Sequence, residues 1–193
     1  HFVSTKLIDL QIADSILIEI VDTTGFIYLV KGDNKIALID DGSGINNIVS
    51  LLLFLASNIS FYDVDECEYT DEKIKILIIE EPESNLHPQL QSKMADLIAE
   101  FVWNSFSMVI VETHSEYLIR KLQYLVAKKK FLADKIALYY FDFDQFHGSS
   151  EISFYPIEIK ENGTLSREFG PGFLDEADNL SIDLFTLLQS QNN

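Results

Sequence analysis

The chain has 193 residues, of which 47% are hydrophobic, and it carries a formal net charge of −17. This length fits one domain or one lobe of a larger domain, and the apolar share is sufficient for a buried core. So acidic a surface repels nucleic-acid phosphates and anionic membranes, which argues against binding of either by this chain alone. The single cysteine, Cys67, excludes an internal disulfide and favours a cytoplasmic location. We expect neither a signal peptide nor a membrane span, because the apolar run at 48–56 is too short.

Residues 1–40 predict an antiparallel β-meander. Apolar and β-branched residues are concentrated at 16–21, 26–30 and 35–39, and turns that contain glycine separate these runs. We therefore expect three short strands before the first long helix.

A glycine-containing turn and a helix are predicted at 41–57. Gly42, Ser43 and Gly44 lie between the third strand and an apolar run that starts near residue 46. Glycine allows a tight turn and close approach of the backbone to a ligand, and the amino terminus of a helix offers free amides to an anion. A strand-to-helix turn with no role beyond folding explains the same residues. An acidic loop is expected next, at 58–73.

An α/β core is predicted at 74–160, and its first strand ends in two carboxylates. The run at 76–79 has no polar face and predicts a buried strand, which Pro82 terminates. Glu80 and Glu81 would then lie at the carboxyl end of a core strand, where open α/β sheets bind ligands. Alternation along the strand points the two carboxylates in different directions, so one could hold Mg²⁺ and the other could orient a water for attack on a phosphate. A structural strand that ends in solvated acids is the alternative.

A second apolar strand at 108–111 leads into Glu112, Thr113, His114 and Ser115. Helical patterns at 89–104 and after Ser115, which is a predicted N-cap, flank this strand. A histidine at such a strand end can donate a hydrogen bond to the terminal phosphate of a nucleotide held by the neighbouring strand. The alternation of strands and helices predicts a mainly parallel sheet with helices on both faces.

Residues 161–193 are expected to form a carboxyl-terminal extension. Asn162 and Gly163 predict a hairpin turn, and an apolar pattern at 182–188 predicts a closing helix that docks on the core. Asp142 and Asp144, at i and i+2 of a predicted strand, could instead ligate a metal, which would suggest a metal-dependent nuclease.

The string at 76–88, Ile-Leu-Ile-Ile-Glu-Glu-Pro-Glu-Ser-Asn-Leu-His-Pro, resembles the Walker B and D-loop region of ABC-type ATPases. It is most similar to the AAA-type relatives that include the OLD-family ATPases. The resemblance implies that Glu80 is the acid associated with magnesium and that Glu81 is the catalytic glutamate. Ser84 and Asn85 would lie on the D-loop.

Two further segments resemble the same family. Glu-Thr-His-Ser at 112–115 looks like the H-loop, which implies that His114 is the switch histidine. The turn at Gly42, Ser43 and Gly44 resembles the signature-like segment that closes on the nucleotide of the opposite subunit. This chain has Asn46 and Asn47 where the family usually has Ser-Gln, which is a departure from that pattern.

The sequence does not contain the Gly-x-x-x-x-Gly-Lys-Ser/Thr loop that cradles nucleotide phosphates. Relatives carry that loop ahead of the signature-like segment. The resemblance therefore implies a half-domain of the P-loop NTPase (ABC) type, with ATP and Mg²⁺ as ligands, that is inactive as an isolated chain. Its implied partners are the missing amino-terminal half and a second copy in an ATP-sandwich homodimer. A non-catalytic interaction module on a degenerate ATPase fold is the alternative.

Overall fold

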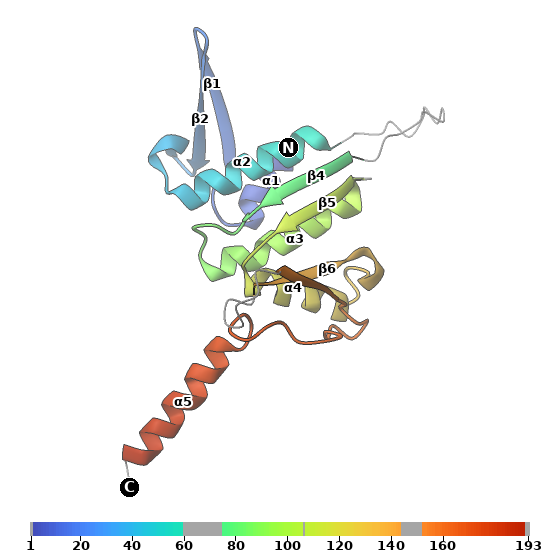
Figure 1. Ribbon diagram of the computed structural model, residues 1–193. Coiled ribbons are helices and arrows are strands. Elements are labelled where there is room, and N and C mark those ends of the chain that lie inside the picture. Colours follow the sequence, from blue (N-terminus) through green and yellow to red (C-terminus); the bar gives the residue numbers. More distant parts are fainter. Residues whose placement is uncertain (1, 60–74, 106, 144–151, 192–193) are drawn as a thin grey trace, which may run out of the picture. The chain divides into compact units, whose positions relative to one another are not determined.

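The computed structural model describes residues 2–59, 75–105, 107–143 and 152–191 (Figure 1). They form two compact units, His1–Lys121 and Leu122–Asn193, and we describe each by itself. From residue 60 on, the acidic loop predicted at 58–73 lies outside the described residues, as does Asp144. None of the helices within the described ranges is long and apolar enough to cross a membrane.

The first unit begins with helix α1 (Phe2–Asp9), which the sequence pattern did not predict. Val3 and Leu7 are buried one turn apart, and Lys6 is buried beside them. Eight residues give too few repeats of the helical period to stand out, and a lysine on the buried face obscures the pattern further.

The β-meander is confirmed. Strands β1 (Ser15–Val21), β2 (Thr24–Lys31) and β3 (Asn34–Ala37) form an antiparallel sheet in the order β1-β2-β3. Each turn has two residues, and the left-handed φ angles of Asp22 (55°) and Gly32 (57°) are those that tight hairpins require. The third strand is shorter than predicted, because the chain enters the 3-10 turn η1 (Leu38–Asp40).

The α/β part of the first unit contains α2 (Ser43–Asn58), β4 (Lys75–Glu80), α3 (Pro88–Asn104), β5 (Ser107–Glu112) and the start of α4 (Glu116–Ala127). Strands β4 and β5 pair in parallel, as predicted. The fold is therefore mixed α/β, with a parallel sheet, helices and a separate antiparallel group, which confirms the predicted class. The core gathers fully buried side chains of α1, α2 and α3, namely Leu7, Ile48, Val49, Leu52, Leu55, Met94 and Phe101.

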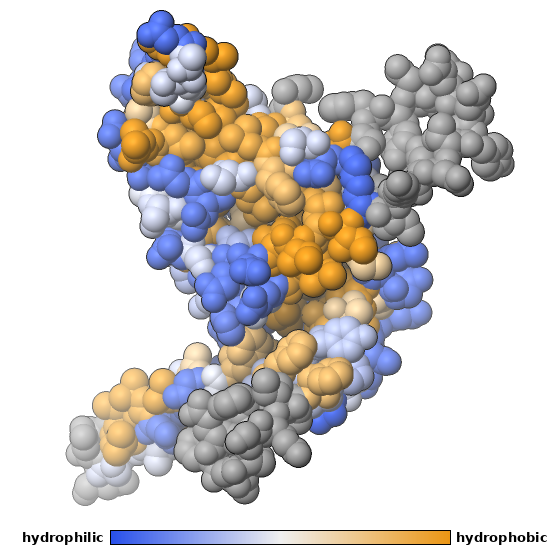
Figure 2. All heavy atoms as spheres, turned by 45° about the horizontal axis from the view of Figure 1, so that its top comes forward, coloured by the Kyte–Doolittle hydropathy of each residue, from blue (hydrophilic) through white to orange (hydrophobic). Residues whose placement is uncertain are grey.

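The parallel sheet has one buried face and one exposed face. Leu77 and Ile79 are buried, whereas Ile78 between them is 65% exposed. On β5, Met108 and Ile110 are also exposed, and Figure 2 shows an apolar area on this part of the surface. The expectation that strand β4 is buried on both sides is therefore wrong for the described residues, because Ile76 and Ile78 on one of its faces are exposed.

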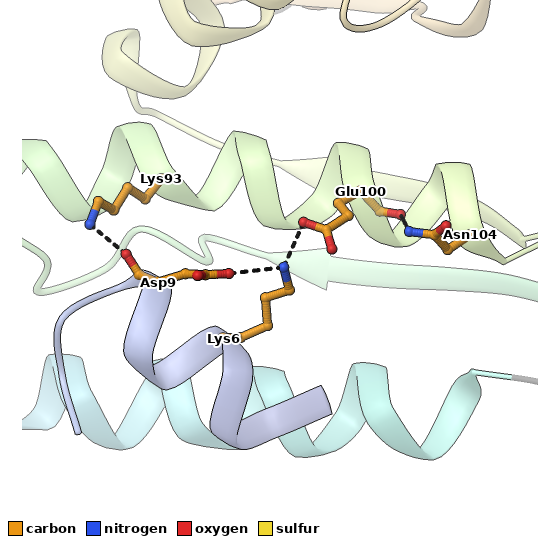
Figure 3. A network of polar contacts seen from close by, with 5 residues as sticks. All are labelled: Lys6, Asp9, Lys93, Glu100 and Asn104. Carbon is orange, nitrogen blue, oxygen red and sulfur yellow. Dashed lines mark hydrogen bonds and ion pairs between the residues drawn. The ribbon is translucent and has the colours of Figure 1, made fainter. Parts of the chain in front are cut away.

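An ion-pair cluster joins α1 to α3 (Figure 3). Lys6 Nζ lies 2.6 Å from Glu100 Oε2 and 3.1 Å from Asp9 Oδ2. Lys93 Nζ donates a hydrogen bond of 2.8 Å to the carbonyl oxygen of Asp9. We call Lys6, Asp9, Lys93 and Glu100 the α1–α3 joint.

The second unit contains η2 (Ala133–Lys135), β6 (Leu138–Phe143), β7 (Ile152–Ile157) and α5 (Glu176–Gln191). β6 and β7 pair in antiparallel fashion. The predicted turn at Asn162 and Gly163 is confirmed, since Lys160 N donates to Thr164 O and Gly163 has a φ of 84°.

Helix α5 forms where a helix was expected, and its apolar side chains are exposed among the described residues. These side chains are between 51% and 63% exposed, namely those of Leu180, Ile182, Leu184, Phe185, Leu187 and Leu188. The backbone bond from Asn179 N to Asp175 O closes the first turn of the helix.

Candidate functional site

The carboxyl ends of β4 and β5 lie side by side because the two strands run in parallel and in register. Glu80 is the ladder partner of Glu112, and both side chains are exposed at the end of their strands. Glu81 extends the pairing by one bond, since its N–H donates to the carbonyl oxygen of Glu112 over 2.9 Å. The acids predicted at the end of β4 therefore meet a third carboxylate from β5.

The turn after β4 is tight and holds the Glu81 carboxylate. Glu81 and Asn85 have left-handed φ angles of 41° and 62°, which are uncommon outside glycine. Ser84 N donates to Glu81 O over 3.0 Å, and Ser84 Oγ donates to Glu81 Oε2 over 2.8 Å. The D-loop-like serine thus orients the carboxylate that is the predicted catalytic base.

The structure brings Glu81 and His114 together. His114 Nε2 lies 3.6 Å from Glu81 Oε1, although the two residues are separated by a helix and a strand in the chain. Both side chains are open to solvent, at 75% exposure for His114 and 52% for Glu81. The imidazole and the carboxylate are therefore near enough to act on one ligand and accessible enough to reach it.

A groove of about 580 Å³ opens beside these strand ends. Of the residues predicted for the site, Glu80, Glu81 and Ser84 line it. Asn47 and Ser50 of α2, together with Glu112, were not predicted as lining residues. Asn47 and Ser50 are three positions apart and share one helix face; nothing in the local sequence separates that face from an ordinary solvated surface. The lining consists of Asn47, Ser50, Leu51, Ile79, Glu80, Glu81, Pro82, Ser84 and Glu112.

The start of α2 packs directly against the turn after β4. A Cβ atom on Gly44 would lie 2.4 Å from the carbonyl oxygen of Asn85, so only glycine allows this approach. Asn47 Nδ2 adds a long hydrogen bond of 3.4 Å to Ser84 O. Gly42 and Ser43 are exposed, and a Cβ on Gly42 would meet nothing within 4 Å. Gly44 is thus explained by packing, whereas Gly42 and Ser43 lie at the surface, where the Gly42 N–H donates to Asp41 Oδ1 over 2.9 Å.

The last three residues of the string, Leu86, His87 and Pro88, are explained by folding. Leu86 is buried, His87 Nδ1 accepts a hydrogen bond from Gln89 N over 3.4 Å, and Pro88 occupies the first turn of α3. Ser115 caps α4 as predicted, since its Oγ accepts from Leu118 N over 3.2 Å.

Carboxylates dominate the charge of the groove. Its described lining includes Glu80, Glu81 and Glu112 and contains neither lysine nor arginine. No group of three metal-ligating side chains occurs within the described ranges. Mg²⁺ usually binds one or two carboxylates together with water and substrate phosphates, so the hard oxygen donors of Glu80 and Glu112 fit that ion. The nuclease hypothesis is not tested, because Asp144 lies outside the described residues.

Comparisons with known proteins identify the family of the chain. Residues 3–119 match the family model of the AAA ATPase domain, and the chain therefore belongs to the AAA ATPase domain family. Residues 133–184 match a second family, described as a protein of unknown function (DUF3696). A comparison with curated proteins yields no match.

Among solved structures, the chain is similar to one from work on the structural biochemistry of ATP-driven dimerization and DNA-stimulated activation of SMC ATPases. The TM-score is 0.53 at 12% sequence identity, and the match covers 95% of this chain and 88% of that chain. At this identity the likeness shows a common fold.

Proposed function

We propose that this chain supplies the Walker B, signature-like and switch-histidine parts of an AAA-type ATP hydrolase. The observation that carries the proposal is the 3.6 Å approach of His114 Nε2 to Glu81 Oε1 at the carboxyl end of two parallel strands, beside an open groove. Family membership implies a nucleotide as the ligand. The parallel strand ends provide the edge at which α/β sheets bind such ligands.

In this proposal each polar side chain at the edge has one role. Glu81, held by Ser84 Oγ, orients the attacking water and accepts its proton. His114 donates a hydrogen bond to the terminal phosphate. Glu80, with Glu112 beside it, holds Mg²⁺, which when bound neutralises the charge of the phosphates. Removal of Ser84 Oγ would release the Glu81 carboxylate from its orientation.

The charge of the groove supports a contribution from elsewhere. A triphosphate meets three carboxylates and no lysine or arginine along the described lining. Repulsion of this kind must be offset by cations, and the lysine and amides of a glycine-rich phosphate loop provide them in P-loop enzymes. We therefore propose that a segment outside these 193 residues supplies that loop.

We also propose that two copies form a homodimer around ATP. The exposed Gly42 and Ser43, at the start of α2, would face the nucleotide of the second copy, where the positive end of the helix dipole favours an anion. Two chains that each carry −17 repel one another, so we expect the dimer to depend on MgATP and to weaken without it.

The test is Glu81→Gln in a protein that joins this chain to a segment with a Gly-x-x-x-x-Gly-Lys-Ser/Thr loop. We expect ATP to bind with a Kd close to that of the parent, whereas kcat falls roughly 10²- to 10⁴-fold because the general base is lost. The matched control is Glu161→Gln, an exposed glutamate on the turn of the second unit. Near-normal kcat in Glu81→Gln would remove Glu81 from this role. Failure of the joined protein to bind ATP would favour a non-catalytic interaction module.

A further inference from the structure

Glu83 is a buried carboxylate that the roles above do not use. It is only 7% exposed, and its Oε1 accepts two hydrogen bonds. One comes from Thr113 Oγ1 and the other from the backbone N–H of His114, each over 2.7 Å. Glu83 thus joins the turn after β4 to the backbone of the residue that faces Glu81.

Further hydrogen bonds close this contact into a ring. Ser115 N donates to Thr113 Oγ1 over 3.0 Å, and Ser115 Oγ donates to Gln91 Oε1 over 2.7 Å. Gln91 Nε2 in turn donates to Leu86 O over 2.9 Å, which returns to the turn after β4. The two loops that carry Glu81 and His114 are therefore connected twice, on either side of His114.

Fold stability alone does not explain a carboxylate at position 83. Among the described residues its hydrogen-bond partners are neutral, and its buried Oε2 has none. Burial of an unpaired carboxylate is costly, and a neutral glutamine would accept the same two bonds at lower cost. An ionised carboxylate at this position strengthens the hydrogen bond from the His114 N–H, because a charged acceptor makes a shorter and stronger bond.

We propose that Glu83 is a positioning residue that holds the backbone of His114 so that its imidazole faces Glu81. Its effect on hydrolysis rests on the proposed function, whereas its effect on the geometry of His114 does not. Nothing in the arrangement requires Glu83 to touch a ligand, since its carboxylate is covered by the two loops it connects.

The geometry can be tested by NMR on the chain as it stands. In Glu83→Ala we expect hydrogen exchange of the His114 amide to accelerate at least about tenfold, since the bond to a charged acceptor is lost. We also expect the nuclear Overhauser contacts between the His114 ring and the Glu81 side chain to disappear. Glu83→Gln should restore the contacts and part of the protection, with the amide proton shifted upfield because a neutral acceptor polarises it less.

The control for stability is Glu100→Gln, the same kind of substitution in the α1–α3 joint. It should lower the unfolding midpoint without changing the His114 amide or its ring contacts. Unchanged exchange and contacts in Glu83→Ala would overturn the proposal and leave Glu83 a packing residue. If Glu83→Ala does not fold, Glu83→Gln decides, and an unshifted His114 amide proton in that variant overturns the proposal equally.

A second experiment uses the protein that joins this chain to a segment with a Gly-x-x-x-x-Gly-Lys-Ser/Thr loop. Glu83→Ala should lower kcat about tenfold or more with little change in KM, and should add little to the loss in Glu81→Gln, because residues that act as one unit are not additive. Absence of ATP hydrolysis in every joined form would defeat the proposed function alone, since the NMR result on His114 is read without nucleotide. A fall in kcat that Glu83→Gln does not rescue, with His114 unmoved, would count against positioning.

Discussion

Two polar clusters hold the first unit together, and they do so in opposite ways. At the α1–α3 joint, the buried Lys6 contacts the carboxylates of Asp9 and Glu100, whose charge is opposite to its own (Figure 3). The side chains of both acids are about half exposed. The second cluster, which we call the groove edge, is the turn after β4 together with the loop that carries His114. Here the buried Glu83 accepts hydrogen bonds only from neutral donors, Thr113 and the amide of His114.

The difference shows what each cluster is suited to do. An ion pair with solvated partners tolerates small movements, because water replaces a lost contact. Hydrogen bonds from fixed loops to one buried oxygen set a single geometry, because any displacement leaves a buried group unpaired. The joint is therefore adapted to connect helices, and the groove edge to fix the relative positions of two loops.

The largest effect is expected where the groove edge depends on close packing. Gly44→Ala should lower the free energy of unfolding by about 3 kcal/mol, the upper part of the usual range for overpacking, since the new Cβ would lie 2.4 Å from Asn85 O. Gly42→Ala, two residues earlier, meets open space and should cost less than about 1 kcal/mol. Urea denaturation of both variants measures the difference, and equal losses would show that α2 does not approach the turn this closely.

The next effect concerns the buried hydrogen bonds of the groove edge. Glu83→Ala should lower the free energy of unfolding by about 2 kcal/mol, because two donors lose their acceptor. The loss should be the same in 0.1 M and 1 M NaCl, since no ion pair is removed. A strong salt dependence in urea titrations would indicate a charged partner of Glu83.

The ion pairs of the α1–α3 joint should contribute less to the free energy of unfolding than the hydrogen bonds of Glu83. Lys6→Met keeps the aliphatic length of the side chain, and the exposed faces of Asp9 and Glu100 allow water to solvate both acids. We expect a loss of about 1 kcal/mol at low salt. This loss should shrink in 1 M NaCl, where the screening length is about 3 Å. A loss that exceeds that of Glu83→Ala would reverse the comparison between the two clusters.

The smallest effect is a pH dependence confined to the joint. Burial lowers the pKa of Lys6, but the hydrogen bonds and charges of Glu100 and Asp9 outweigh it, so that the pKa lies above its ordinary value of 10.5. A raised lysine pKa stabilises the fold fully below the unfolded-state pKa, and this contribution is lost as pH rises through the folded-state pKa. Thermal melts of the parent and Lys6→Met should differ by a constant amount below pH 10.5 and converge above it. Convergence at neutral pH instead would contradict the raised pKa.

Local pattern predicted much of the α/β architecture. Apolar runs that end in polar residues predicted β4 and β5, and the helical period predicted α2, α3 and α4, because these signals repeat along consecutive residues. The same reasoning missed α1. This helix is too short for its period to stand out, and its buried face is defined by contacts with distant segments that the local pattern does not encode.

For the site, the sequence alone was enough to predict that Glu80, Glu81 and His114 belong to one edge, because parallel strands bring their carboxyl ends together. The roles assigned to these residues stay predictions. The 3.6 Å contact between Glu81 and His114, the approach of Gly44 to Asn85 and the burial of Glu83 under Thr113 and His114 were decided only by the tertiary structure. Each joins segments far apart in the chain, and such distances follow from how helices and loops pack rather than from the periodicity of any one segment.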